Sequence, residues 1–563
     1  MAGQSRKWMI LVATIWIQAF TGTNFDFSAY SSELKSVLGI SQVQLNYLAV
    51  ASDLGKVFGW SSGLALMYFP IWTVLFAAAF MGFVGYGVQW LVITNFISLP
   101  YIMVFLCCLL AGLSICWFNT VCFVLCISNF PANRSLALSL TVSFNGVSAA
   151  LYTLAYNAIN PTSPELYLLL NALIPLVISF TAIIPILRQP PFEPLPPDGV
   201  RRDSLMFLIL NILAALNGVY LLLFESNSSA RLLFGGAIIL LILPLCIPGL
   251  VIARNWYLRT IHTSFRLEGS GFILVDPDEL ELHKGMLAHE ANRASYQLLS
   301  DDVVPNQVKT MAVEEGDTGG ELLISRGQLE LLGIEHSLWQ LLSRADFWFY
   351  YVAYFCGGTI GLVYSNNLGQ IAQSLGQSSN TTTLVTLYSS FSFFGRLLSA
   401  TPDYIRAKVY FARTGWLAIA LLPTPIALFL LASSGTASAL QVGTALMGLS
   451  SGFIFAAAVS ITSELFGPNS VGVNHNILIT NIPIGSLIYG FLAALVYDSH
   501  GTTGIKSMTD SVVCMGRGCY RMTFVWWGCL SVLGLGSSLV LFIRTRKAYQ
   551  RFEQARISSN IDS

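Results

Sequence analysis

An acid and a base stand three residues apart near the middle of an apolar stretch, as Asp53 and Lys56 within residues 45–69. Ionisable side chains are costly inside a membrane, so they usually face a cavity or a partner. A spacing of three places both side chains on one face of a helix. Asp53 would then bind a proton or a substrate, with Lys56 as its partner or as a ligand for an anion. The same pattern also fits a neutralised pair that only holds helices together, and both interpretations stay open.

Three asparagines and a second aspartate also lie in apolar stretches: Asn145, Asn366, Asn481 and Asp26. The amides are candidates for hydrogen bonds to a small polar substrate. Alternatively, they join neighbouring helices, where such bonds are worth about 0.6 kcal/mol each. Asp26 lies near the outer end of the first stretch. It is either a gate or substrate contact or, as we favour, an interface residue that reaches headgroup water.

The composition excludes an ordinary soluble enzyme. Of 563 residues, 54% are hydrophobic and 10% are charged, whereas soluble domains carry about 25% charged residues. The 29 basic and 29 acidic residues balance, so no nucleic-acid footprint is present. No phosphate loop, metal-ligand pattern or hydrolase motif occurs, and we therefore expect no cofactor, no metal and no enzymatic activity.

Apolar stretches of about 20 residues, the length needed to cross a bilayer, recur about fourteen times. They fall into groups of six, two and six, which predicts an all-α polytopic membrane protein. The expected parts are a six-helix half, two additional helices, a hydrophilic linker, a second six-helix half and a tail, at 1–188, 189–253, 254–344, 345–545 and 546–563.

Basic residues between the stretches predict that both termini are cytosolic. The sequons at Asn227 and Asn380 then face the outer side, where glycosylation is possible. Cys514 and Cys519 share an outer loop in which a disulfide can form. The plasma membrane and the endomembranes fit equally. The 254–344 linker is read as cytosolic and partly disordered, with a short amphipathic lead at 336–342.

One offset of 336 residues relates the first six stretches to the last six. Gly22-Thr23 maps onto Gly358-Thr359, Gly112-Leu-Ser onto Gly448-Leu-Ser, and Asn145 onto Asn481. Shifting whole six-helix units preserves their orientation, so the repeat is parallel. Two six-helix halves in parallel are the architecture of the major facilitator superfamily.

A short motif ends the tenth stretch and continues into the loop after it, with Gly395, Arg396, Asp403 and Arg406 as its main residues. It resembles the superfamily's loop motif, in which small residues, an acid and bases stabilise the outward-facing state by a charge network on the cytosolic side. The first-half counterpart, at 59–67, has no acid or base. A conformational lock is therefore expected in the second half only, unless the bases are ordinary positive-inside charge.

Several longer motifs carry a more specific resemblance. They are Asp53-Leu-Gly-Lys-Val-Phe-Gly-Trp-Ser-Ser-Gly63, Cys116-Trp-Phe-Asn119, Asn129-Phe-Pro-Ala-Asn-Arg134, Ser143-Phe-Asn-Gly146, Asp346-Phe-Trp348 and Cys356-Gly-Gly358. With these the chain resembles the plant Nodulin-like family of major facilitator proteins, of the nuclear-fusion-defective type. The resemblance implies a multi-pass membrane protein of the facilitator fold.

The function expected from these features is secondary transport of a small polar metabolite by alternating access. More distant similarity to oxalate/formate and monocarboxylate facilitators implies an organic anion, and Asp53 would bind the proton if transport is coupled. The alternative is a receptor or scaffold that does not transport and that binds protein partners through the 254–344 loop.

Overall fold

The computed structural model describes most of the chain outside the central linker. The described residues are 2–23, 27–40, 42–160, 163, 165–187, 197–223, 230–251, 264–268, 271–275, 332–377, 380–406, 410–500 and 514–561. The chain divides into two compact units, of which the larger comprises Met9–Pro244 with Gln328–Ser563 and the smaller Met1–Trp8 with Leu245–Gly327. Everything below concerns the larger unit unless stated.

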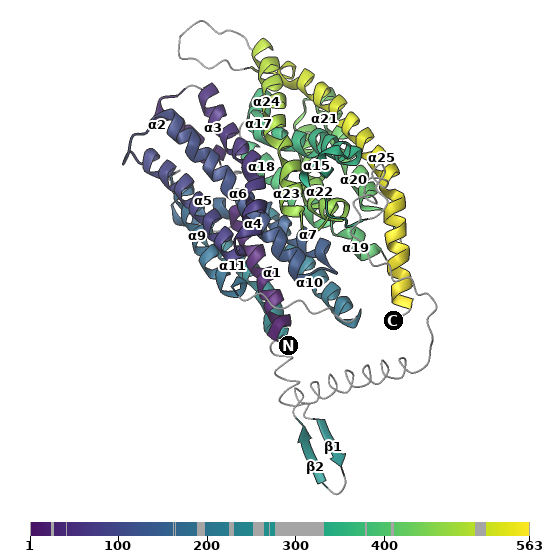
Figure 1. Cartoon of the computed structure of the whole chain (residues 1–563). Helices are drawn as coiled ribbons and strands as arrows, with labels where there is room; N and C mark the ends of the chain where they lie inside the picture. The colour runs from purple at the N-terminus through teal and green to yellow at the C-terminus, as the bar shows by residue number, and fades with distance from the viewer. Residues whose placement is uncertain are drawn as a thin grey trace. The chain divides into compact units, whose positions relative to one another are not determined.

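The first half is helical throughout its described length (Figure 1). Its elements are α1 (Ala2–Thr21), α2 (Phe27–Leu38), α3 (Gln42–Gly55), the 3-10 turn η2 (Lys56–Gly59), α4 (Trp60–Tyr68), α5 (Ile71–Ile93), α6 (Tyr101–Asn129), α7 (Arg134–Asn145), α8 (Ser148–Ile159) and α9 (Leu166–Ile186). The two additional helices are α10 (Pro197–Leu223) and α11 (Ala230–Ile242), with the 3-10 turn η3 (Leu243–Leu245) after them.

The second half begins with a short helix that leads into its first span. Its elements are α15 (Leu338–Ser343), α16 (Ala345–Tyr354), the π-helical turn η4 (Phe355–Thr359), α17 (Ile360–Ser374), α18 (Thr381–Leu398), α19 (Thr401–Ile405), α20 (Arg413–Leu421), α21 (Pro423–Ser433), α22 (Ala437–Phe466), α23 (Val471–Ile479), α24 (Asn481–His500) and α25 (Gly518–Ile561). A capping box between Ser337 and Gln340 begins α15, which confirms the predicted lead.

Ten helical stretches of the described chain are long and apolar enough to cross a membrane. The other four predicted spans are also helical, but they are more polar or interrupted: α1, α3 with η2 and α4, α16 with η4 and α17, and α18. Large apolar side chains point outward from the helices, as at Leu232, which is 75% exposed. A hydrocarbon solvent favours such a surface, and the chain is an integral multi-pass membrane protein.

Glycines at one repeat-related contact show that both halves pack alike. A Cβ on Gly112 would lie 1.8 Å from the Ser52 carbonyl oxygen, and one on Gly448 would lie 2.5 Å from the Tyr388 carbonyl oxygen. Both partners are shifted by the same 336 positions. Close helix packing through small residues is how helices associate in lipid. The contact α3–α6 therefore recurs as α18–α22, as the parallel repeat predicts.

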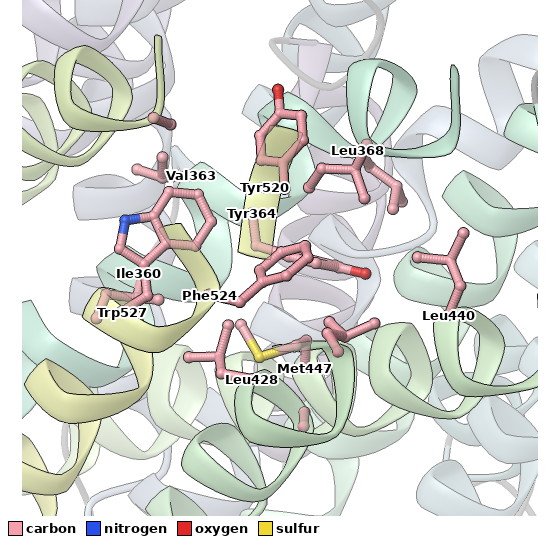
Figure 2. Packing of buried hydrophobic residues seen from close by; sticks show 14 of the residues in the cluster. Ile360, Val363, Tyr364, Leu368, Leu428, Leu440, Met447, Tyr520, Phe524 and Trp527 are labelled. Atoms are coloured by element: carbon pink, nitrogen blue, oxygen red, sulfur yellow. The ribbon is translucent and has the colours of Figure 1, made fainter. Parts of the chain in front are cut away.

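One core cluster of the second half is built from large buried side chains on several helices. Figure 2 shows Tyr364 of α17, Leu428 of α21, Met447 of α22, and Phe524 and Trp527 of α25 packed together. Inside lipid these side chains gain van der Waals contact and little from the hydrophobic effect. Their fit fixes how α25 lies along the second half, where Figure 1 shows it as a long yellow helix.

Two features of the structure differ from the predicted division of the chain. In the smaller unit, β1 (Ser264–Glu268) and β2 (Gly271–Val275) form an antiparallel hairpin with Ser264 opposite Val275, within the linker for which no strand was predicted. One hairpin alone is marginally stable. In the larger unit, α25 runs unbroken past position 545 into the predicted tail.

Candidate functional site

Asp53 and Lys56 form an ion pair that also reaches the other half. The Lys56 Nζ donates to Asp53 Oδ1 at 2.6 Å, and the Ser486 hydroxyl of α24 donates to Asp53 Oδ2 at 2.9 Å. Asp53 is 7% exposed and Lys56 6%. The helix changes to a 3-10 turn at Lys56, immediately after α3, and such turns within a helix often mark hinges. The pair therefore joins the two halves at a break in its own span.

Asp53 lines a cavity of about 140 Å³ that we call the Asp53 cavity. Its polar lining comes from both halves: Tyr30, Ser52, Asp53, Tyr86, Gln89, Ser365, Asn366 and Ser389. Among the described residues that line it, Asp53 is the one carboxylate. The predicted candidate Asn366 is thus brought beside Asp53.

Lys56 lines a second cavity, of about 100 Å³, that we call the Arg396 cavity. Its polar lining is Gln18, Lys56, Asn119, Asn145, Tyr354, Arg396 and His475. The Arg396 guanidinium donates from one Nη to the Val142 carbonyl at 3.1 Å and to Asn145 Oδ1 at 3.3 Å. It also lies 5.7 Å from the centroid of the Phe455 ring, a distance at which a cation is attracted to a ring face.

Two of the predicted residues lie elsewhere. Asn481, the repeat mate of Asn145, accepts a bond from the Thr359 hydroxyl at 2.7 Å and lines neither cavity. Its contact joins α24 to η4, which is the helix-joining alternative. Asp26 lies outside the described residues. Of these two repeat-related asparagines, Asn145 therefore lines a cavity and Asn481 is bonded between helices.

A charge network occupies what we call the Arg-rich end, where Arg134, Arg406, Arg413 and Arg544 lie. Arg413 donates to both Asp403 oxygens, at 2.7 and 3.0 Å, and to Glu464 Oε1 at 3.0 Å. Arg406 donates through Nε to Glu553 at 2.8 Å. Asp403 and Arg406 of the predicted motif thus take part in a network, and Arg413 is its centre.

The same network reaches the first half through α7. Arg413 donates to the Ser135 hydroxyl at 2.9 Å, and Ser399 donates to the Ser139 hydroxyl at 2.8 Å. The Ser139 hydroxyl in turn donates to the Arg396 carbonyl at 2.8 Å. Gly395 lets α18 approach α22 within the second half, since a Cβ there would lie 2.2 Å from the Leu449 carbonyl oxygen. These bonds join the two halves at the Arg-rich end.

The repeat-related contact, between α4 and α23, has no charged residue among its closest contacts. A Cβ on Gly63 would lie 2.7 Å from the Gly472 carbonyl carbon. The Asn476 amide donates to the Thr120 hydroxyl at 2.9 Å and to the Gly472 carbonyl at 2.6 Å. The α4–α23 contact, which is the repeat-related counterpart of the charged contact, thus depends on glycine packing and one amide.

The segment before α15 is docked on the start of α23. Glu335 accepts bonds from the Asn469 and Ser470 amides at 2.8 and 2.9 Å, and from the Ser470 hydroxyl at 2.6 Å. The His336 ring meets the Phe466 ring edge-on, with centroids 5.6 Å apart. Burial lowers the pKa of the His336 imidazole, although its bond to the Ile334 carbonyl opposes this. The uncharged ring is thereby favoured at this contact.

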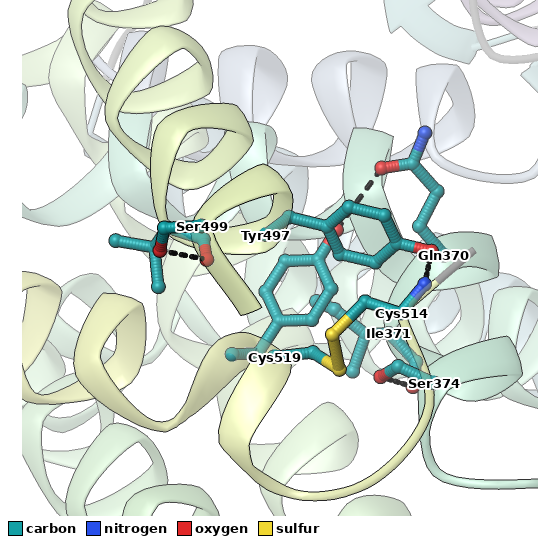
Figure 3. Close-up of a disulfide and its surroundings, with 9 residues drawn as sticks. Gln370, Ile371, Ser374, Tyr497, Ser499, Cys514 and Cys519 are labelled. Carbon is teal, nitrogen blue, oxygen red and sulfur yellow. Dashed lines mark hydrogen bonds between the residues drawn. A yellow bond between two sulfur atoms is a disulfide. The ribbon is translucent and has the colours of Figure 1, made fainter. Parts of the chain in front are cut away.

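At the opposite end the structure places Cys514 and Cys519 in a disulfide, with Cα atoms 5.9 Å apart. Figure 3 shows Tyr497 beside it, whose hydroxyl accepts a bond from the Cys514 amide at 3.0 Å. Asn380 is exposed, as a glycosylated asparagine must be, while Asn227 lies outside the described residues.

Sequence reasoning missed two residues of these sites, and it did not predict that a third lines a cavity. Ser486 is a common residue 433 positions from Asp53, and no local pattern marks it. Arg413 begins α20 and was counted only as positive-inside charge. Arg396 was assigned to the gate motif with its neighbours, whereas its side chain lines a cavity. An arginine inside an otherwise apolar helix was the available signal for that position.

Parallel halves that enclose ionisable residues define a membrane protein of the major facilitator fold. A solved structure, the proton:xylose symporter XylE bound to 6-bromo-6-deoxy-D-glucose, matches with a TM-score of 0.52 and 13% identity over 95% of each chain. At that identity the likeness shows the fold alone.

The family is shown by sequence comparison. The Nodulin-like family matches residues 7–249, and the C-terminal domain of NFD4 matches residues 329–551. Protein NUCLEAR FUSION DEFECTIVE 4 of Arabidopsis thaliana is 63% identical over 562 residues, which are 99% of this chain and 92% of that protein. The chain belongs to the Nodulin-like family of the nuclear-fusion-defective type. Probable transporter MCH1 of Yarrowia lipolytica is 29% identical over 199 residues, 34% of this chain and 40% of its own.

Proposed function

We propose that this protein is a secondary transporter of a small organic anion, working by alternating access and coupled to protons. The observation that carries the proposal is the Arg396 cavity, which is lined from both halves and faced by two buried cations, Lys56 and Arg396. Facilitator proteins bind substrate between their halves and expose it by rocking one half against the other.

The charge of the cavity supports the anionic substrate class. None of the described residues that line it is a carboxylate. A cation enclosed at membrane depth is costly unless something neutralises it. A negatively charged substrate supplies the missing charge, and its removal from water is offset by the same two side chains. The relative MCH1, whose name says probable transporter, is consistent with transport.

The arrangement of contacts supports alternating access. The Arg-rich end, which we place in the cytosol, is closed by bonds from Arg413 and Ser399 to α7. Asp53 and Ser486 add one contact between the halves deeper in the fold. Rocking the halves to expose the Arg396 cavity on the Arg-rich side must break the first set, which therefore acts as the gate.

One observation favours a second candidate function. At the end of the linker, Glu335 accepts a bond from the Asn469 amide just before α23. The His336 carbonyl accepts a bond from the Asn474 side chain within α23. A protein bound to the 254–344 loop would thus act directly on a helix at the interface between the halves. A receptor or scaffold role for the loop rests on this contact.

Exchange measurements in liposomes test the transport proposal. The full chain is reconstituted and offered radiolabelled oxalate, pyruvate, succinate, glutamate, glucose and adenosine, with protein-free liposomes as the reference. We expect uptake of one or more of the carboxylates, driven by an inward proton gradient. Asp53→Asn should lose the gradient-driven component while exchange of the anion without a gradient persists, which shows that the variant is folded.

The matched control is Lys547→Gln, which removes an exposed cation of α25 and should leave uptake unchanged. Uptake of none of the solutes above the protein-free rate would contradict the proposal. A chain lacking residues 276–331 that transports normally would in addition argue against the linker as the functional element.

A further inference from the structure

Arg396 differs from the other buried or half-buried arginines of its half. Arg413 pairs with Asp403 and Glu464, Arg406 with Glu553, and Arg544 with Asp346. No carboxylate of the described chain pairs with Arg396, which is 4% exposed. Its Nε donor also has no hydrogen-bond partner. A guanidinium has five donors in a planar fork, and in Arg396, which lines the cavity, the Nε donor of that fork is unused.

Other groups around the same cavity also lack partners. The Asn145 Nδ2 and the His475 Nδ1 are buried without a hydrogen bond, although both residues line the Arg396 cavity. Buried polar groups are nearly always satisfied, so several unsatisfied groups around one cavity call for an explanation, and a bound polar ligand would supply it. A planar carboxylate matches the guanidinium fork bidentately, so the class of ligand that fits is a small carboxylate anion.

Among the described charged residues, Lys56 is the one that connects the two cavities. Its ammonium bonds Asp53, which lines the Asp53 cavity, while Lys56 itself lines the Arg396 cavity. An ammonium has three donors and a flexible stem. A carboxylate held by Arg396 would therefore compete with Asp53 for the same cation.

We propose that a carboxylate bound at Arg396 takes Lys56 from Asp53, and that Asp53 then binds a proton from the Asp53 cavity. This rests on the proposed transport function and supplies its coupling step. Lys56 keeps its own protons throughout. The incoming proton forms one O–H bond at the Asp53 carboxylate, which is left neutral, and the net change is one anion and one proton bound together.

The surroundings of Asp53 leave Lys56 as its only charged partner among the described groups. From α24 the Ser486 hydroxyl faces it, and the Cys116 thiol of α6 lies close enough to interact with both members of the pair. The other titratable groups of the Asp53 cavity are Tyr30, Tyr86 and Cys108. None of these carries a positive charge that would replace Lys56, so losing Lys56 favours the protonated carboxyl.

Binding measured as a function of pH tests the proposal on the full chain in detergent. The probes are oxalate, pyruvate and succinate, with oxamide and succinamide as uncharged counterparts. Uptake of a whole proton requires Kd to rise about tenfold per pH unit, because the binding of the two ligands is reciprocal. Calorimetry in two buffers of different ionisation enthalpy counts the protons directly. The amides should not bind.

Three variants separate the parts of the site. Asp53→Asn removes the competitor, so anion binding should become tighter and independent of pH. Lys56→Gln should weaken binding and also remove the pH dependence. Arg396→Gln should abolish binding while leaving the melting temperature of the empty protein unchanged or higher, since an uncompensated buried cation is lost; this shows that the variant folds. Arg396→Lys should restore binding only in part, because an ammonium lacks the fork.

The outcomes distinguish this inference from the transport function beneath it. Anion binding and exchange that do not depend on pH, with Asp53→Asn like the parent, would overturn the coupling step and leave transport standing. Full binding in Arg396→Gln would overturn the site. If no probe binds the parent chain and none is exchanged in liposomes, both the inference and the proposed function fail.

Discussion

The interface between the halves contains two contacts that the repeat relates to each other, and they are built from different residues. At an offset of 336, α4 and α23 correspond to the region of α18–α19 and to α7. The α4–α23 contact rests on Gly63 against Gly472. The α7 contact rests on Arg413, Ser399 and their bonds to Ser135 and Ser139.

The difference indicates which contact opens. The α4–α23 contact has few directional bonds, from the Asn476 amide to the Thr120 and Ser62 hydroxyls, so its glycine packing tolerates a small rotation while the backbones stay in contact. The charged contact depends on fixed donor and acceptor geometry, and its members lose their bonds together. Rocking of the halves is therefore expected to break the α7 contact and to use the α4–α23 contact as the pivot.

The largest expected effect comes from removing the centre of the charged contact. Arg413→Gln leaves Asp403 and Glu464 without their cation, and breaking a buried pair in this way costs about 3–5 kcal/mol. The melting temperature of the detergent-purified protein should fall accordingly. A cysteine placed at Ser135 should also react faster with an impermeant maleimide, because the Arg-rich end opens.

Two further variants sharpen this result. Arg413→Lys keeps the charge but loses the fork that reaches Asp403, Glu464 and Ser135, and it should be intermediate. Arg551→Gln removes an exposed arginine of α25 and should change neither readout. If Arg413→Gln melts like the Arg551 variant, the network is ordinary surface charge and the proposed lock does not exist.

A smaller effect is expected at the pivot. A methyl group at Gly63 would lie 2.7 Å from both the Gly472 carbonyl carbon and the Val473 side chain, so the backbones must separate. Overpacking of this kind costs about 1–3 kcal/mol. Gly63→Ala should lower the melting temperature without raising labelling at Ser135, in contrast to the Arg413 variant.

Gly87→Ala is the matched control for the pivot, since the nearest atom to its new methyl group is 4.0 Å away. It should be neutral or slightly stabilising, as alanine is the better helix former. Equal stability of the two alanine variants would mean that α4 and α23 are not in contact in the membrane protein.

Sequence patterns predicted what is local or repeated. Span positions follow from runs of apolar residues, the repeat from one constant offset, and the Asp53–Lys56 pair from a spacing of three. The sites also depend on contacts between residues far apart, such as Asp53 with Ser486 or Arg413 with Ser135, which lie 433 and 278 positions apart. Such contacts are set by helix packing, and a serine or an arginine looks the same in sequence whether or not it makes one.

The smallest effect is expected from the contacts at the first turns of α7 and α23. Arg413 bonds Ser135 at the start of α7, and Glu335 bonds the Ser470 amide at the start of α23. A carboxylate near an exposed helix N-terminus is worth about 0.3–1 kcal/mol. Glu335→Gln loses that charge, so amide exchange at the start of α23 should become roughly two- to fivefold faster.

The exchange rates at the start of α7 serve as an internal reference for this change, and Glu33→Gln on α2 is the charge-matched control. Faster exchange confined to α23 would show that the linker's end stabilises the pivot helix alone, so that a partner bound to the linker would act on the pivot and not on the lock. Faster exchange in both helices would mean that pivot and lock are coupled through the shared interface, which contradicts their separate roles.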